Sequence, residues 1–254
     1  MKLRAAETAE AVNGNIIYGD ADTLICNITT DSNKMKGEDL FVPIIGARVD
    51  AHKFIVNAAK AGATAAFTAY DTDKLAELSG LSAEGFTEAL SAKAPGRDRS
   101  FVLIKVDETR NALQSLGAYY REKYVHIPYV GVTGSVGKTT LREMTACALS
   151  ASYKVYSTKG NANSQTGVPI TVTETDEAAD IGVIEMGMSE FDEMSRISEV
   201  VKCDTAVFTV IGVSHIGNLG SRENIMREKL HILDGMHDGG KLILNADDDM
   251  LSRD

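Results

Sequence analysis

The stretch "GVTGSVGKTT", residues 131–140, decides the fold of the second half of the chain. Gly137, Lys138 and Thr139 fit the end of the P-loop pattern G-x-x-x-x-G-K-[ST], while Val132 stands where the pattern has its first glycine. An apolar run precedes the stretch, and a helical pattern follows it from about residue 138 to 150. A strand that enters a glycine loop and opens a helix points several backbone N–H groups at one place, where an anion is attracted. The stretch therefore predicts a phosphate-binding loop.

The residues of this loop have separate expected roles. Gly134 and Gly137 allow the backbone to close around phosphates. Lys138 is expected to reach the β- and γ-phosphates of a nucleotide, and the Thr139 hydroxyl to bind Mg²⁺. The alternative is a tight strand-to-helix turn that leaves Lys138 in solvent. The phosphate loop is favoured because an ordinary turn needs neither so many glycines nor a G-K-T run.

Apolar runs and helical patterns alternate along the whole chain. After residue 127 the apolar runs are nearly continuous, which indicates a parallel sheet covered by helices on both faces. These runs are "YKVYST" (153–158), "DIGVIEMG" (180–187), "TAVFTVIG" (205–212) and "KLILN" (241–245). A charged helix is expected near 222–236. We expect an α/β protein with two domains, residues 1–124 and 125–254, the second of which stops just after a strand and is incomplete.

The first half has shorter runs, which indicate a small mixed α/β unit. Strands are predicted within "LICNITTD" (24–31), "DLFVPIIG" (39–46), "ATAAFTAY" (63–70) and "FVLIKV" (101–106). Helices are predicted at 52–61 and 107–124. The segment 71–99 is rich in Ala, Glu, Ser and Lys, and predicts one or two surface helices that end in the turn "APGRDR", residues 94–99.

The composition excludes several classes of function. A formal net charge of −10 argues against a general nucleic-acid or anionic-membrane surface, because polyphosphate would be repelled. Cys26, Cys147 and Cys203 form no C-x-x-C pair, which favours free thiols in a reducing cytosol over a disulfide framework or a zinc site. No window approaches 18 apolar residues. We expect a cytoplasmic protein without nucleic-acid or membrane-inserted partners.

Three further residues are candidates for the chemistry. Glu185 ends an apolar strand, where a carboxylate that holds Mg²⁺ would lie, although a strand-end acid can simply face water. His215 follows the strand at 205–212 in a loop, and the pattern favours a metal or phosphate role no more than a turn-capping role. Lys229 lies in "RENIMREKLHI", a pattern that by itself predicts a solvated helix face.

Five motifs of the second half, taken in order, resemble the ATP-dependent Mur ligases of peptidoglycan synthesis. They are "GVTGSVGKTT", "STKGNANSQTGVP", "VIEMGMSE", "SHIGNLGSRENIMREK" and "LNADDD". In the first half, "TTDSNKMKGEDLFVPIIGARVDAHKFIVNAAKAGATAAF" is similar to the UDP-binding domain of the family. The motifs are most similar to the branch that adds D-Ala-D-Ala to UDP-N-acetylmuramoyl-tripeptide (UDP-MurNAc-tripeptide).

The resemblance implies a monomeric ATP- and Mg²⁺-dependent enzyme that forms an amide through an acyl phosphate. Matched by motif, the nucleotide-binding residues are Gly134, Ser135, Gly137, Lys138, Thr139, Thr140 and Asn245. The implied metal residues are Thr139, Glu185 and His215. The implied catalytic residues are Lys138, His215 and Lys229, the last as a carbamylated lysine. The implied substrate residues are Asp31, Ser32 and His52 on the uridine side, and Asn161 and Asn163 on the peptide side.

The chain departs from the family pattern at Asn33, Ser164, Asp192, Val210 and His231, which touch mainly the uridine and peptide surfaces. The acceptor therefore stays open, and another Mur-type ligase that adds a different amino acid is an alternative. A non-catalytic nucleotide-binding module and a P-loop kinase are further alternatives. Family members carry a third domain that closes over ATP, so we expect this chain to be a fragment with little ligase activity by itself.

Overall fold

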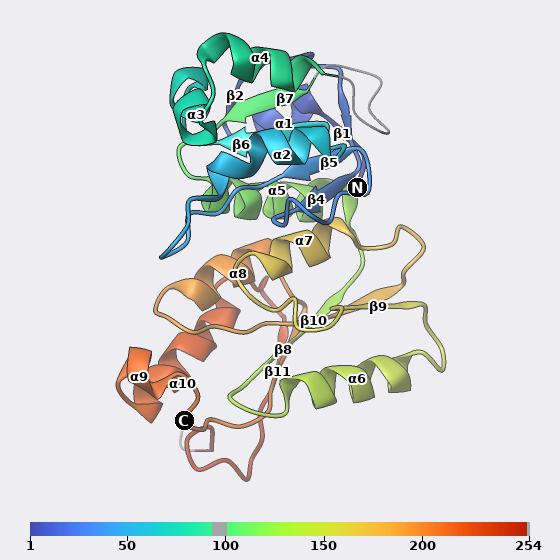
Figure 1. The fold of residues 1–254 in the computed structure, drawn as a ribbon. Helices are drawn as coiled ribbons and strands as arrows, with labels where there is room; N and C mark the ends of the chain where they lie inside the picture. The colour runs from blue at the N-terminus through green and yellow to red at the C-terminus, as the bar shows by residue number, and fades with distance from the viewer. Residues whose placement is uncertain (93–100, 253–254) are drawn as a thin grey trace. The chain divides into compact units, whose positions relative to one another are not determined.

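The structure is a computed structural model that describes residues 1–92 and 101–252. It contains two compact units, Met1–Leu116 and Gly117–Asp254, joined within helix α5 (Thr109–Tyr124) (Figure 1). Among the described residues, every helix is too short or too polar to cross a membrane. The turn expected at 94–99 lies outside the described residues.

The first unit is built on a five-stranded mixed sheet. Its strand order is β2 (Asn15–Tyr18), β7 (Val102–Lys105), β6 (Ala65–Thr68), β5 (Asp39–Phe41) and β4 (Asn27–Thr29). The β2–β7 pair is antiparallel and the other pairs are parallel. Two short strands, β1 (Leu3–Arg4) and β3 (Leu24–Ile25), pair separately. The small mixed α/β unit predicted from the sequence is confirmed.

Helices of the first unit supply much of its core. They are α1 (Ala5–Ala11), the 3₁₀ helix η1 (Ala51–Phe54), α2 (Ile55–Lys60), α3 (Thr72–Ser79) and α4 (Ala83–Ser91). Leu75 of α3 and Phe86 of α4 are buried in the same cluster as Phe41 and Phe101. The prediction of one or two helices within 71–99 is met by α3 and α4, whose apolar faces bury side chains that stabilise this unit.

The second unit is a five-stranded parallel sheet, as the nearly continuous apolar runs predicted. Its order is β12 (Lys241–Ile243), β11 (Thr205–Phe208), β8 (Tyr129–Thr133), β10 (Ile181–Glu185) and β9 (Val155–Ser157). The strand order reverses at β8, which lies between β10 and β11. The carboxyl ends of these three strands form the kind of crevice where open α/β sheets bind ligands.

Helices cover both faces of this sheet (Figure 1). Helix α6 (Lys138–Leu149) packs on one face, and α7 (Gly167–Thr173) and α8 (Glu193–Val201) pack on the other. The remaining helices are α9 (Ile216–Leu219), α10 (Arg222–Leu230) and the 3₁₀ helix η2 (His231–Leu233). The helix expected at 222–236 thus ends at Leu230, because the chain tightens into η2 and a loop before β12.

Candidate active site

The glycine loop connects β8 to α6, and at Gly134 it passes so close to Thr209 that no side chain fits. Gly134 has φ +139°, and a Cβ added there would lie 1.9 Å from the Oγ1 atom of Thr209. Gly137 precedes α6 in the left-handed conformation, with φ +81°. The Ser135 N–H donates to the Val210 carbonyl at 2.8 Å. The loop is therefore fixed against the end of β11, in a conformation that only glycine adopts at these two positions without strain.

Lys138 folds back over this loop. Its Nζ donates to the Gly134 carbonyl oxygen at 3.0 Å. Burial lowers the pKa of Lys138, while the nearby charge of Glu185 acts in the opposite direction. The hydroxyls of Thr133 and Ser135 are buried, and no group of the described residues 1–92 and 101–252 bonds to them. Buried hydroxyls normally have hydrogen-bond partners, so these two are free to bond to a ligand in the loop.

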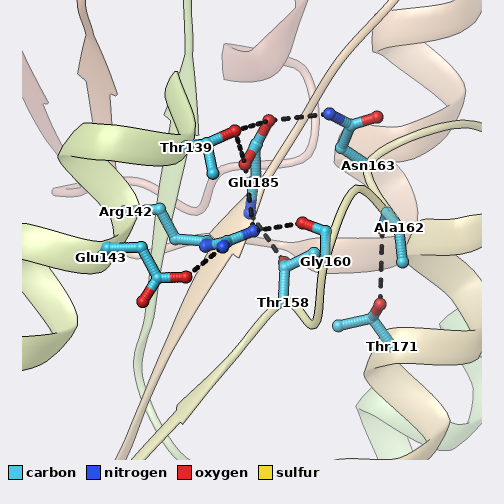
Figure 2. Close-up of polar contacts among 9 residues, drawn as sticks. All are labelled: Thr139, Arg142, Glu143, Thr158, Gly160, Ala162, Asn163, Thr171 and Glu185. Carbon is cyan, nitrogen blue, oxygen red and sulfur yellow. Dashed lines mark hydrogen bonds and ion pairs between the residues drawn. The ribbon is translucent and has the colours of Figure 1, made fainter. Parts of the chain in front are cut away.

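Glu185 is the centre of a buried polar cluster at the end of β10 (Figure 2). Its side chain is 2% exposed, and the carboxylate accepts from the Thr139 hydroxyl at 3.0 and 3.2 Å. It also accepts from Asn163 Nδ2 at 2.7 Å and from Arg142 Nη1 at 3.1 Å. Its own N–H donates to Thr158 Oγ1 at 2.9 Å. Glu185 is therefore a paired, hydrogen-bonded buried charge, and the alternative of an acid that faces water is wrong.

Arg142 belongs to this cluster and was missed by the sequence analysis. Its side chain is 2% exposed, and Nη1 also donates to the Gly160 carbonyl oxygen at 2.8 Å. On its other side the guanidinium pairs with Glu143. The available signal was spacing, because Thr139 and Arg142 are three residues apart and so share a face of α6. Periodicity does not reveal which charge on a helix is buried.

The loop between β9 and α7 carries the two asparagines expected at the peptide. Asn163 reaches Glu185, whereas the Asn161 side chain is exposed. Gln165 Nε2 donates to Glu193 Oε1 at 2.6 Å, and Glu193 Oε2 also accepts from the Ser189 N–H at 2.6 Å. Residues 158–165 are thus fixed both to the end of β10 and to the segment that follows it.

Lys229 lies on α10 and is 1% exposed, so the solvated helix face predicted from the pattern alone is wrong. No group among the described residues forms a hydrogen bond or an ion pair with its ammonium. Burial and the positive charge of Lys138 lower the pKa of Lys229 to about 7, against the opposing charge of Glu228. A buried lysine without a partner is unusual unless it has a function.

His215 is not brought to Glu185. It precedes α9 with φ +64°, and its residue surface is exposed. In the described part of the chain no three His, Cys, Asp or Glu side chains gather as a metal cluster. Its loop is nevertheless close to the site, because Ser214 Oγ donates to the Ser135 carbonyl oxygen at 3.2 Å and Asn218 Nδ2 donates to the Ser189 carbonyl oxygen at 3.0 Å.

Asn245 lies in the segment after β12, and Asp248 holds that segment to the loop after β11. Asn245 Oδ1 accepts from the Asp247 N–H at 3.1 Å. Asp248 accepts from the Ile211 N–H at 2.8 Å. The motif "LNADDD" is thereby held to the loop after β11, next to Val210, whose carbonyl accepts from Ser135 of the glycine loop. Thr140 is exposed on the first turn of α6.

A second candidate pocket lies in the first unit, with a volume of about 260 Å³. It is lined by Thr30, Asp31, Ser32, Asn33, Phe41, Ala51, Phe54 and Asn57. Asp31 and Ser32 therefore line one pocket, as expected of residues that share a ligand. His52 is fully buried instead: Nδ1 is 2.6 Å from Asp50 Oδ1, and Nε2 accepts from the Ala69 N–H at 3.1 Å.

Comparison with known proteins gives one family for both halves of the chain. The model of the Mur ligase family, catalytic domain, matches residues 24–121, and the model of the Mur ligase middle domain matches residues 132–253. The UDP-N-acetylmuramoyl-tripeptide–D-alanyl-D-alanine ligase of Bacillus subtilis is 35% identical over 99% of this chain and 50% of its own length. The same ligase of Escherichia coli is 29% identical over 97% of this chain and 48% of its own length.

Solved structures agree with these relatives. A crystal structure of MurF from Acinetobacter baumannii superimposes with a TM-score of 0.80 at 28% identity, over 99% of this chain and 50% of that chain. MurF ligase from Thermotoga maritima in complex with ADP gives 0.69 at 26% identity, over 90% and 47% of the two chains. This chain spans about half the length of the curated relatives it matches. With family matches on both units and this shared fold, the chain belongs to the Mur ligase family.

Proposed function

We propose that the chain provides the nucleotide and UDP-substrate sites of an ATP-dependent ligase that adds D-Ala-D-Ala to UDP-MurNAc-tripeptide. The observation that carries the proposal is the buried Glu185, which accepts from Thr139 at the start of the helix that follows a P-loop. The names of the relatives support the reaction, and the ADP complex of the Thermotoga maritima protein supports the nucleotide. The domain roles, uridine in residues 1–124 and ATP in 125–254, belong to the same proposal.

The nucleotide phosphates would lie in the glycine loop. Gly134 and Gly137 would present backbone N–H groups. Ser135 would contribute its hydroxyl, which has no partner among the described residues, because its N–H already donates to Val210. Lys138 would exchange its bond to the Gly134 carbonyl for the β- and γ-phosphates. Thr140 would contribute from the first turn of α6, and Asn245 from the segment after β12 on the adenine side.

Mg²⁺ fits the donor set around Glu185, because a carboxylate and a hydroxyl are hard oxygen ligands. A Thr139 hydroxyl that donates its proton to Glu185 keeps its oxygen lone pairs available for the metal. His215 would approach from the loop held to Ser135, in the manner that the resemblance implies. When bound, Mg²⁺ would supply positive charge where two anions have to meet.

Lys229 would contribute as a carbamate. Its burial, the absence of a partner among the described residues and its lowered pKa together favour an amine without its proton. Such an amine can attack CO₂: a new N–C bond forms, one proton leaves the nitrogen, and the product is an anion with two oxygens. A carbamate would turn a cation into an oxygen ligand for the second metal of the site.

The protein groups then suit an acyl-phosphate reaction. The terminal carboxylate of the tripeptide attacks the γ-phosphorus of ATP, and ADP leaves. The D-Ala-D-Ala amine next attacks the acyl carbon, loses a proton and expels phosphate. Lys138 would offset the repulsion between the carboxylate and the γ-phosphate in the first step. Asn161 and Asn163 would face the peptide from a loop that Glu185 and Glu193 hold in place.

The uridine part of the substrate would occupy the pocket of the first unit. Phe54 offers aromatic surface for a base, while Asp31, Ser32 and Asn57 offer polar atoms. His52 would act from behind the pocket wall, because both of its ring nitrogens already have protein partners. We therefore propose that His52 orders the segment around Asp50 and makes no direct contact with the uridine.

Phosphate release by the full gene product tests the proposal. We expect release from ATP only when Mg²⁺, UDP-MurNAc-tripeptide and D-Ala-D-Ala are all present, and none in Lys138→Ala. A panel of other amines checks the acceptor, and better turnover with a different amino acid would identify another Mur-type ligase. Lys229→Ala should be inactive and regain activity with a small carboxylate. Phosphate release without an amide product would exclude the ligase.

A further inference from the structure

We propose that Arg142 is an internal counter-cation of Glu185, which keeps free Mg²⁺ out of the site until a nucleotide supplies its phosphates. Arg142 is thus a positioning residue for Glu185. The inference rests on the proposed metal role of Glu185. It adds the order of binding: the nucleotide binds before the metal or together with it.

The first observation is the burial of the pair. The side chains of Arg142 and Glu185 are each 2% exposed, and Nη1 lies 3.1 Å from Oε2. Opposite charges this close and this dry largely cancel each other at a distance. Lys138 adds a second positive charge that acts on Glu185. A free dication therefore meets little net negative charge here, although it must give up tightly held water to bind.

The second observation is the occupancy of the carboxylate. Oε1 accepts from Asn163 and Thr139, and Oε2 accepts from Arg142 and Thr139. The single Thr139 proton is shared between the two oxygens, so three donors occupy a carboxylate that has about four lone-pair sites. While these contacts hold, little of the carboxylate is left for a metal. A metal that arrives with a nucleotide brings phosphate oxygens of its own. Those oxygens add negative charge and reduce the number of ligands that Glu185 has to provide.

The third observation is that Arg142 is held from behind (Figure 2). Nη1 also donates to the Gly160 carbonyl at 2.8 Å, and Glu143 pairs with the guanidinium from the exposed side. Gly160 belongs to the loop that continues to Asn163, and Asn163 also donates to Glu185. Arg142 therefore fixes the carboxylate and the loop proposed to face the peptide with the same group. A metal that separates Arg142 from Glu185 would therefore also change the contacts that hold residues 160–163.

The test is metal binding in the absence of nucleotide, with Mn²⁺ as the spectroscopic probe. For the wild type we expect weak Mn²⁺ binding without ADP and clear retention with ADP. Arg142→Gln should bind free Mn²⁺ about tenfold more tightly than the wild type or better, which corresponds to about 1.4 kcal/mol. Mg²⁺ should also raise the thermal midpoint of this variant more than that of the wild type. Arg142→Lys, which keeps the charge, should behave like the wild type.

Two further variants serve as controls. Arg121 is another arginine of the second unit whose side chain is mostly covered, but it bonds to the backbone carbonyls of Val201 and Lys202 and lies only 3.9 Å from Asp204. Arg121→Gln should lower stability and leave Mn²⁺ binding unchanged. Arg142→Gln combined with Glu185→Gln should lose the gained affinity, because the carboxylate is gone.

The outcomes separate this inference from the proposed function. Equal Mn²⁺ affinity of the wild type and Arg142→Gln would overturn the inference alone, provided that ADP still needs the metal. ADP binding that is independent of both Mg²⁺ and Glu185 would overturn the metal role and the inference together. If Arg142→Gln does not fold, the wild type still decides, because tight Mn²⁺ binding without ADP contradicts a counter-cation.

Discussion

Replacement of Lys229 by Met should stabilise the second unit. The pKa of Lys229 falls from its ordinary 10.5 to about 7 on folding. At about 1.36 kcal/mol for each pKa unit, the buried amine costs the native state roughly 4 kcal/mol at pH 7. Methionine has a similar length and no charge, so Lys229→Met should recover about 2–4 kcal/mol of this cost. A residue that destabilises its own fold to this extent has to be explained by function.

The pH dependence gives the sign of the effect independently. Between pH 7 and 10.5 the unfolded lysine is protonated and the native lysine is not, so unfolding takes up a proton. Wild-type stability should therefore rise with pH across this window and level off above it. Lys229→Met should lack this contribution. Its gain over the wild type should then shrink as the pH rises.

Urea unfolding at pH 7 and pH 9, in buffer free of Mg²⁺ and CO₂, measures this effect. Hydrogen exchange of the α10 amides isolates the second unit, because two units need not unfold together. Lys241→Met on the exposed strand β12 is the control and should change stability by less than about 0.5 kcal/mol. The reasoning is refuted if Lys229→Met is less stable than the wild type at pH 7, or if the two proteins share one pH profile.

The other predictions concern the loop and its supports. Gly134→Ala should abolish ADP binding in calorimetry, because its Cβ would overlap Thr209 Oγ1 at 1.9 Å. Thr139→Val should weaken Mg²⁺-dependent ADP binding about tenfold or more and Thr139→Ser should retain it, since only serine keeps the hydroxyl; equal loss in both would argue against a role of the hydroxyl. Burial by itself would raise the pKa of Asp248, but three backbone N–H groups donate to the carboxylate and the net pKa is lowered. Asp248→Asn should therefore cost about 1–3 kcal/mol at pH 7 in urea unfolding, and less as the pH falls below about 4.

The fold was predictable where apolar residues form long runs and where a loop carries a specific motif. The nearly continuous apolar runs after residue 127 gave the parallel strands, and the G-K-T run gave the loop before α6. Strand β2 and helix α1 were not predicted, because they are short and only partly buried. Helices α7 and α8 were also missed, because each is short; in α8, Met194, Ile197 and Val201 do recur at helical spacing, over only nine residues.

The sequence allowed us to predict which residues form the site, but not which of their side chains are buried. Thr139 and Glu185 do meet, as a strand-end acid beside a P-loop helix suggests. Arg142 and Lys229 are buried ionisable side chains, and a sequence window treats such side chains on a helix as solvent-facing. Their burial depends on which helices pack beside them, which is a property of the tertiary fold.

Transfer of oxygen from substrate to phosphate tests the central claim most directly. The full gene product is incubated with ATP, Mg²⁺, D-Ala-D-Ala and UDP-MurNAc-tripeptide labelled with ¹⁸O in its terminal carboxylate. An acyl-phosphate ligase must leave one carboxylate oxygen on the released phosphate, so we predict one ¹⁸O in phosphate for each amide formed. Amide formation with unlabelled phosphate, or phosphate release without amide, would contradict the account.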